Sequence, residues 1–77
     1  MGSKNTVKTK DFIKVLVHLG LKLSRTNGSH QVWSRADLTR PVIVQATKKE
    51  LPKFVLSNNC KTLGITVDDF FRILNGL

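Results

Sequence analysis

Apolar residues recur at helical spacing near the start of the chain and predict a first helix over residues 9–19. The apolar stripe consists of Phe12, Ile13, Leu16, Val17 and Leu19. Thr9 is expected to be the N-cap, because its side-chain oxygen can accept a hydrogen bond from a free N–H of the first turn. Gly20 is expected to end the helix. His18 falls between the apolar positions, so we expect it at the surface.

Apolar and polar residues then alternate, which predicts two β-strands over residues 21–26 and 29–35. The pair Asn27-Gly28 between them predicts a tight type I′ turn. Both central residues of such a turn need a positive φ, which glycine adopts freely and asparagine tolerates. The two segments are therefore expected to form a β-hairpin with a two-residue turn.

A turn at these two residues decides which residues face each other across the hairpin. His30 is expected opposite Arg25, with Cβ atoms about 5 Å apart, and Val32 is expected opposite Leu23. Both pairs are expected on the side of the sheet that packs against helices, with His30 near the turn, where the core becomes thin. The other side is expected to carry Lys22, Ser29, Gln31 and Trp33.

The rest of the chain predicts one more strand and two more helices. Residues 41–45 are mainly β-branched and apolar, with proline at the first position, and predict a third strand. An apolar stripe over residues 51–63 predicts a second helix that ends at Gly64, and Thr66 with Asp69 predicts the cap of a short last helix. This order predicts an α+β fold, α-β-β-β-α-α, with a three-stranded antiparallel sheet and helices on one face.

Composition adds a strong positive charge to this picture. The 77 residues include 13 Lys and Arg against 5 Asp and Glu, which gives a net charge of +8 and a pI of about 10.3. A small basic domain indicates a polyanionic partner, either a nucleic acid or an acidic protein. Residues 1–77 are expected to form one domain in which residues 1–8 are loosely ordered.

Several other kinds of site are not expected. Cys60 is the only cysteine, which leaves no internal disulfide and no thiolate metal cluster, and the two histidines are distant in sequence. No apolar run approaches the roughly 20 residues that a membrane helix needs, and the first residues lack the apolar core of a signal peptide. We therefore expect a cytoplasmic protein with no metal, no small-molecule cofactor and no membrane partner.

His30 is the strongest candidate for chemistry. A neighbouring Arg25 would disfavour the charged imidazolium, so the ring would stay neutral, as a general base should be. The same cation, with Lys22 or the pair Lys48 and Lys49, could hold a phosphate. RNA supplies its own nucleophile, the 2′-hydroxyl, so a base and a few cations suffice for cleavage. The alternative is that His30 is an ordinary residue at the end of a sheet, either hydrogen-bonded or exposed.

Trp33 has two interpretations. It can stack an RNA base on the open face of the sheet, or it can cover an apolar patch or a partner interface. Because the chain has one tryptophan and no tyrosine, a platform that stacks several bases is not expected.

The sequence resembles the HicA (YcfA-like) toxins of bacterial and archaeal HicA–HicB toxin–antitoxin modules, from about Lys10 to Leu74. The resemblance centres on a short glycine, serine and histidine motif followed by an apolar and aromatic pair. The matching segments are Leu19-Gly20, Gly28-Ser29-His30 with Val32-Trp33, Pro41-Val42-Ile43-Val44, Lys49-Glu50-Leu51, Leu63-Gly64-Ile65-Thr66 and Asp69-Phe70. The sequence departs from the family pattern at Ser57, where an arginine is usual, and at Asn59 and Cys60, where apolar residues are usual.

The resemblance implies a fold like that of double-stranded-RNA-binding domains and the activity of an mRNA interferase, an endoribonuclease that cleaves messenger RNA. It implies that His30 is catalytic and that a HicB-type antitoxin binds and masks the toxin. We therefore expect metal-independent cleavage, with mRNA and the antitoxin as partners. The residues expected to bind RNA phosphates are Lys22, Arg25, Ser29, Lys48 and Lys49, and those that shape the turn are Asn27 and Gly28. The alternatives are a non-catalytic RNA-binding module and a domain that binds an acidic protein.

Overall fold

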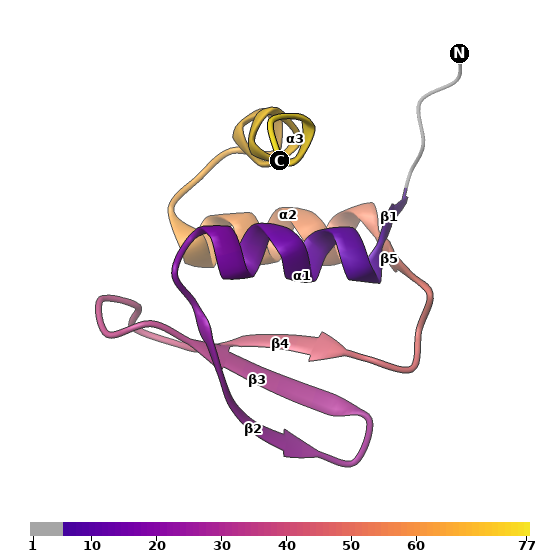
Figure 1. The fold of residues 1–77 in the computed structure, drawn as a ribbon, viewed down its shortest axis with the longest axis vertical. Helices are drawn as coiled ribbons and strands as arrows, with labels where there is room; N and C mark the ends of the chain where they lie inside the picture. Colours follow the sequence, from indigo (N-terminus) through magenta and orange to yellow (C-terminus); the bar gives the residue numbers. More distant parts are fainter. Residues whose placement is uncertain (1–5) are drawn as a thin grey trace.

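The computed structural model describes residues 6–77 and contains three helices and five strands (Figure 1). In chain order they are β1 (Thr6–Lys8), α1 (Thr9–His18), β2 (Lys22–Asn27), β3 (His30–Ser34), β4 (Val42–Gln45), β5 (Glu50–Pro52), α2 (Lys53–Leu63) and α3 (Val67–Asn75). The expected α+β class and three-stranded antiparallel sheet, in the order β2-β3-β4, are confirmed. The expectation of loose order falls mostly on residues 1–5, which lie outside the described residues. Thr6–Lys8, by contrast, form strand β1.

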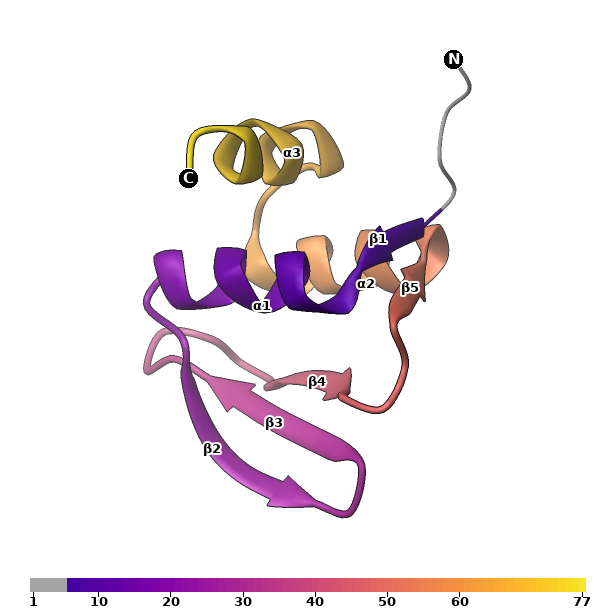
Figure 2. The ribbon, with the colours of Figure 1, turned by 45° about the vertical axis from the view of Figure 1, so that its right-hand side comes forward.

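The elements form three layers, which Figures 1 and 2 show from two directions. The sheet lies on one side, α1 and α2 cover one of its faces, and α3 crosses them on the side away from the sheet. Phe12 of α1 and Phe70 of α3 are completely buried, with ring centroids 5.7 Å apart, so the aromatic pair joins two layers. No helix of the described residues covers the second face of the sheet. Among residues 6–77, none of the helices has the length and apolar character needed to cross a bilayer.

A small second sheet, which the sequence pattern does not predict, joins the start of the chain to the segment before α2. Strand β1 pairs antiparallel with β5, with Val7 opposite Leu51 and both side chains buried. The hydroxyl of Thr6 also donates a hydrogen bond to Glu50 Oε1 at 2.9 Å. This ladder holds the connection between β4 and β5 against the N-terminal end of α1.

Two of the helix caps expected from the sequence are present in the structure, and one is not. Gly64 ends α2 with a φ of +77°, and Thr66 and Asp69 form the expected capping box of α3. The hydrogen bond from the backbone N–H of Thr66 is the main cause that lowers the pKa of the Asp69 carboxyl. The expected cap at Thr9 is wrong, because its hydroxyl instead donates to the carbonyl oxygen of Lys48 at 2.6 Å. A hydrogen bond to a residue 39 positions away thus takes the place of the expected cap within the first turn of α1.

The hairpin turn is one residue further along the chain than expected. Asn27 is paired with His30, so Gly28 and Ser29 are the central residues of the turn. Gly28 has a φ of +64°, and no residue other than glycine has a positive φ in the described part of the chain. The expected type I′ turn over Asn27-Gly28 is therefore wrong. Glycine at the first central position is the arrangement of a type II′ turn, which also suits a hairpin.

This shift inverts the two faces of β3. Trp33 points to the helices and is only 8% exposed, whereas His30 and Val32 lie on the open face. Leu23 is opposite Trp33 but is 45% exposed, because the edge strand β2 extends beyond the cover of the helices. Leu23 lies on the expected side of the sheet, the side that faces the helices. The expectation that Val32 and His30 also pack against the helices is wrong. The large apolar surface of Trp33 decides the register.

Candidate nucleic-acid interface

His30 is the first residue of β3 and lies exposed on the open face of the sheet. Its backbone is held on both sides, because it pairs with Asn27 of β2 and with Gln45 of β4. The preceding residue, Ser29, accepts a hydrogen bond from the backbone N–H of Ala46 at 2.7 Å. The imidazole is therefore presented to solvent from the middle strand of the sheet, at a backbone position fixed by two neighbours.

Arg25 and Lys22 lie on the same face as His30. Arg25 faces Val32 in regular register from the turn, and a β-bulge at Ser24, which inserts one extra residue into β2, brings Lys22 opposite Ser34. Arg25 is thus a diagonal neighbour of His30, and the expected direct pairing of the two is wrong. That they share a face is confirmed, although it is the open face. Within residues 6–77, neither cation takes part in an ion pair.

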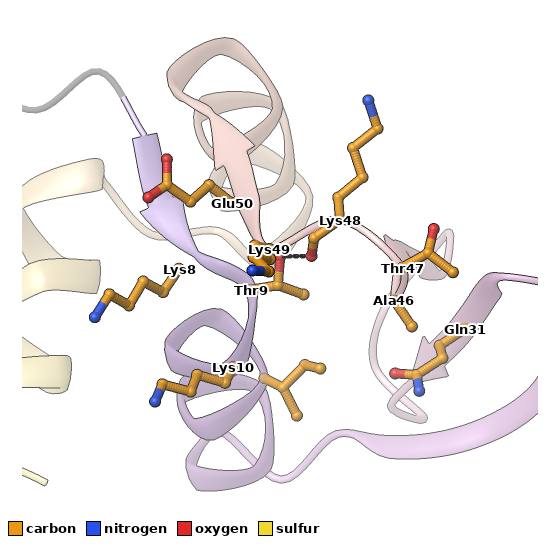
Figure 3. A pocket seen from close by; sticks show the side chains of 10 residues that line it. Lys8, Thr9, Lys10, Gln31, Ala46, Thr47, Lys48, Lys49 and Glu50 are labelled. Carbon is orange, nitrogen blue, oxygen red and sulfur yellow. Dashed lines mark hydrogen bonds between the residues drawn. The ribbon is translucent and has the colours of Figure 1, made fainter.

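Lys48 and Lys49 belong to a different surface, a groove of about 570 Å³ (Figure 3). They lie in the connection between β4 and β5, and the groove is also lined by Lys8, the last residue of β1, and by Lys10 in the first turn of α1. We call this surface the lysine groove. Its backbone is fixed by the Thr9 hydroxyl and by a hydrogen bond from the backbone N–H of Thr9 to the carbonyl oxygen of Lys49 at 2.9 Å.

The lysine groove carries a net positive charge. Glu50 is the only carboxylate among the residues that line it, and the hydroxyl of Thr6 donates to that carboxylate. In the described part of the chain, none of the four lysines that line the groove lies within ion-pair distance of a carboxylate. Four lysines without acidic partners make a suitable site for phosphate groups, which bind mainly through charge.

The lysine groove and His30 lie at the same end of the sheet but on opposite sides of it. Gln31 lines the groove from the face covered by helices, and its neighbour on the strand, His30, points to the opposite face. Ser29 lies between them, since its hydrogen-bond partner Ala46 also lines the groove. The structure therefore places Arg25 diagonally next to His30, while Lys22 lies further along the same face, opposite Ser34. Lys48 and Lys49 lie together in the lysine groove.

Other candidates for chemistry are less suitable. Cys60 is buried, and burial raises the pKa of its thiol to about 11, which disfavours the reactive thiolate. Trp33 is in the core, with its Nε1 donating to Gln31 Oε1 at 3.2 Å, so the interpretation of a base-stacking residue is wrong. His18 is exposed on α1, as expected. Within residues 6–77, no three His, Cys, Asp or Glu side chains come together in a way that could hold a metal ion.

Sequence reasoning missed Lys8 and Lys10 as members of the lysine groove. Lys8 falls in the segment expected to be loose and Lys10 in the first turn of the expected helix, and their place beside the β4–β5 connection depends on the pairing of β1 with β5. Both strands have only three residues, too few to give a periodic signal. Only the two lysines on either side of a single threonine could have drawn attention to this segment.

The sequence matches a known protein family. A family model described as "HicA toxin of bacterial toxin-antitoxin" covers residues 9–65, from the first residue of α1 to just beyond α2. The matched segment contains the hairpin with His30, the Arg25 side of the open face, and Lys48 and Lys49. Searches of curated proteins and of solved structures return no significant match.

Proposed function

The chain belongs to the HicA toxin family of bacterial toxin–antitoxin systems, and on this basis we propose that it is an endoribonuclease that cleaves messenger RNA with His30 as general acid/base. Membership of the family makes it a toxin with a cognate antitoxin. The observation that carries the proposal is the position of His30, exposed on the open sheet face, with Arg25 and Lys22 on the same face. An accessible base with a cation beside it is what RNA cleavage through the 2′-hydroxyl requires.

In the proposed step, the imidazole of His30 accepts the proton of a ribose 2′-hydroxyl as that oxygen attacks the adjacent phosphorus. The bond from phosphorus to the 5′-oxygen breaks, and the leaving oxygen takes a proton from the same imidazolium. The products are a 2′,3′-cyclic phosphate and a 5′-hydroxyl end. Arg25, the diagonal neighbour of His30, offsets the charge that develops on the phosphate, so the step needs no metal ion.

The lysine groove would hold RNA away from the bond that is cleaved. Lys48 and Lys49 bind phosphates there, and Ser29 lies between the groove and the open face. A HicB-type antitoxin would cover both surfaces, because acidic groups on it compete with RNA for the same cations. We further propose that residues 1–77 act as one domain, in the cytoplasm, where mRNA is found.

Matched histidine variants test the proposal. Purified wild type should cut single-stranded RNA, with or without a metal chelator, and His30→Ala should cut it about 10²- to 10⁴-fold more slowly. His18→Ala is the control, because it removes the other histidine from an exposed site on α1. Circular dichroism should show that both variants are folded. Equal cleavage by His30→Ala and wild type would show that another group performs the chemistry.

A non-catalytic RNA-binding module is the second candidate. It is favoured by the position of the lysine groove, where RNA can bind on the covered side of the sheet without meeting His30. In that case the wild type binds RNA with strong salt dependence but leaves it intact. Growth arrest by the wild type, together with normal growth when His30→Ala is expressed at the same level, supports the nuclease instead.

A further inference from the structure

A second hollow, distinct from the lysine groove, lies on the open face of the sheet close to His30. Its volume is about 360 Å³, which is within the lower range of small-ligand pockets. One side is formed by β2 and β3, and the other by residues 38–41 of the connection to β4. We call this hollow the open-face pocket.

Two arginines line the open-face pocket. Arg25 comes from β2 and Arg40 from the connection before β4, and both are exposed. In the described part of the chain, neither guanidinium forms an ion pair. Asp37, the nearest acid to Arg40 in the sequence, is already held by Arg35, whose guanidinium donates to both carboxylate oxygens at 2.6 and 3.1 Å. The two arginines therefore remain available for an anion from outside the chain.

The other lining residues suit a nucleoside. The hydroxyls of Ser24, Ser34 and Thr39 can donate and accept hydrogen bonds at the edge of a base or at a ribose. Val32 and Leu38 add half-buried apolar surface, against which the flat face of a base can lie. Charge, hydroxyl groups and apolar surface together fit one nucleotide with its phosphate.

The open-face pocket is one step along the strand from His30. Val32, which lines the pocket, is two residues after His30 on the same face of β3. Two residues of strand span roughly 7 Å. This is similar to the spacing of successive phosphates in an extended single strand of RNA, so a strand with one phosphate at His30 would bring its neighbour to the arginines.

We propose that Arg40, together with Arg25, binds the nucleotide next to the bond cleaved at His30 in a single-stranded RNA. This inference rests on the proposed function and extends it to a residue outside the expected site. The RNA is single-stranded because the base in the pocket must be unpaired to reach the hydroxyls of β2, β3 and the connection. Arg40 acts through binding and leaves proton transfer to His30.

Arg40→Gln tests the proposal, with Arg72→Gln as the matched control. Arg72 is also an exposed arginine, although it pairs with Asp69 at 3.2 Å, and it belongs to α3, the helix on the side away from the sheet (Figure 2). Arg40→Gln should raise the KM for single-stranded RNA about tenfold and change kcat little, because one charge-assisted contact is lost. Arg40→Lys should recover only part of the affinity, since lysine keeps the charge but not the two-pronged geometry. Melting temperatures show whether each variant is folded.

Binding measurements separate this inference from the proposed function. They use uncut single-stranded RNA and the His30→Ala background. If wild type never cleaves RNA but Arg40→Gln still weakens binding about tenfold relative to Arg72→Gln, the nucleotide site stands and the nuclease assignment fails. If wild type cleaves and Arg40→Gln behaves like Arg72→Gln in both KM and binding, the nucleotide site is wrong. Loss of antitoxin binding without loss of RNA binding would likewise overturn it and assign the pocket to the protein partner.

Discussion

Replacing Lys48 and Lys49 together by glutamine should weaken the salt dependence of RNA binding. Both lysines are exposed and line the lysine groove, without an ion-pair partner among residues 6–77. Glutamine keeps a polar side chain at each position but removes its charge. The contact of Thr9 with the loop uses backbone carbonyls of these two residues and is therefore left in place.

The size of the effect follows from the number of phosphate contacts. Each phosphate neutralised on a single strand contributes roughly 0.7 to the slope of log binding constant against log salt concentration. Two contacts at Lys48 and Lys49 therefore contribute about 1.4. Lys8 and Lys10 remain in the groove, so the double variant should retain part of the slope.

Fluorescence anisotropy of a labelled single-stranded RNA, over a series of salt concentrations, measures this slope. The His30→Ala background keeps the RNA intact. The control is Lys61→Gln with Arg72→Gln, which removes the same two positive charges from α2 and α3, outside the lysine groove. If both double variants reduce the slope equally, the effect comes from net charge and the groove has no special role. An unchanged slope in Lys48→Gln/Lys49→Gln would also refute the reasoning.

Three further predictions concern stability. Thr9→Val should lower the free energy of unfolding by about 1–3 kcal/mol in urea titrations, because the carbonyl of Lys48 loses its partner; an unchanged midpoint would contradict this. Thr66→Ala should cost about 1 kcal/mol by removing the capping box of α3, and Thr66→Ser should restore most of it. The raised pKa of Cys60 means that the unfolded thiol ionises at lower pH than the folded one, so stability should fall as pH rises from about 9 towards about 11. Cys60→Ala should lack this part of the pH dependence in the same titration.

Features that depend on neighbouring residues could be predicted from the sequence. Gly64 and the pair Thr66 and Asp69 mark helix ends correctly, because a positive φ and a capping box involve only a few consecutive residues. The three strands of the main sheet begin and end within about two residues of the expected positions. Their number and order then led to the correct fold class.

The register of the hairpin could not be predicted in the same way. Gly28 can occupy either central position of a tight turn, so the local signal permits two alignments that differ by one residue. The observed alignment buries Trp33 and puts Arg25, opposite Val32, on the face of His30, and the bulge at Ser24 returns Lys22 to that face. Burial of a large side chain against distant helices is a tertiary effect, and a one-residue change reverses every side chain of a strand.

The two basic surfaces differ in how much the sequence reveals. The charge of Lys48 and Lys49 and their place before a helix predict that they bind phosphate. The sequence does not predict that they lie across the sheet from His30. The role of His30 was suggested by its motif and by the resemblance to a toxin family, whereas its exposure on the open face became visible only in the structure. Arg40 carries no motif, and its place beside Arg25 depends on the path of the connection before β4.

The ladder between β1 and β5 also bears on the order in which the molecule folds. It joins residues 44 positions apart, such as Thr6 and Glu50, whereas the hairpin that carries His30 closes over two residues. Closing a long loop costs more entropy, so distant pairings tend to form after local ones. We therefore expect a newly made chain to present the strand of His30 before it possesses the lysine groove. Refolding of Val7→Ala tests this order, because a late contact should accelerate unfolding and leave the folding rate nearly unchanged.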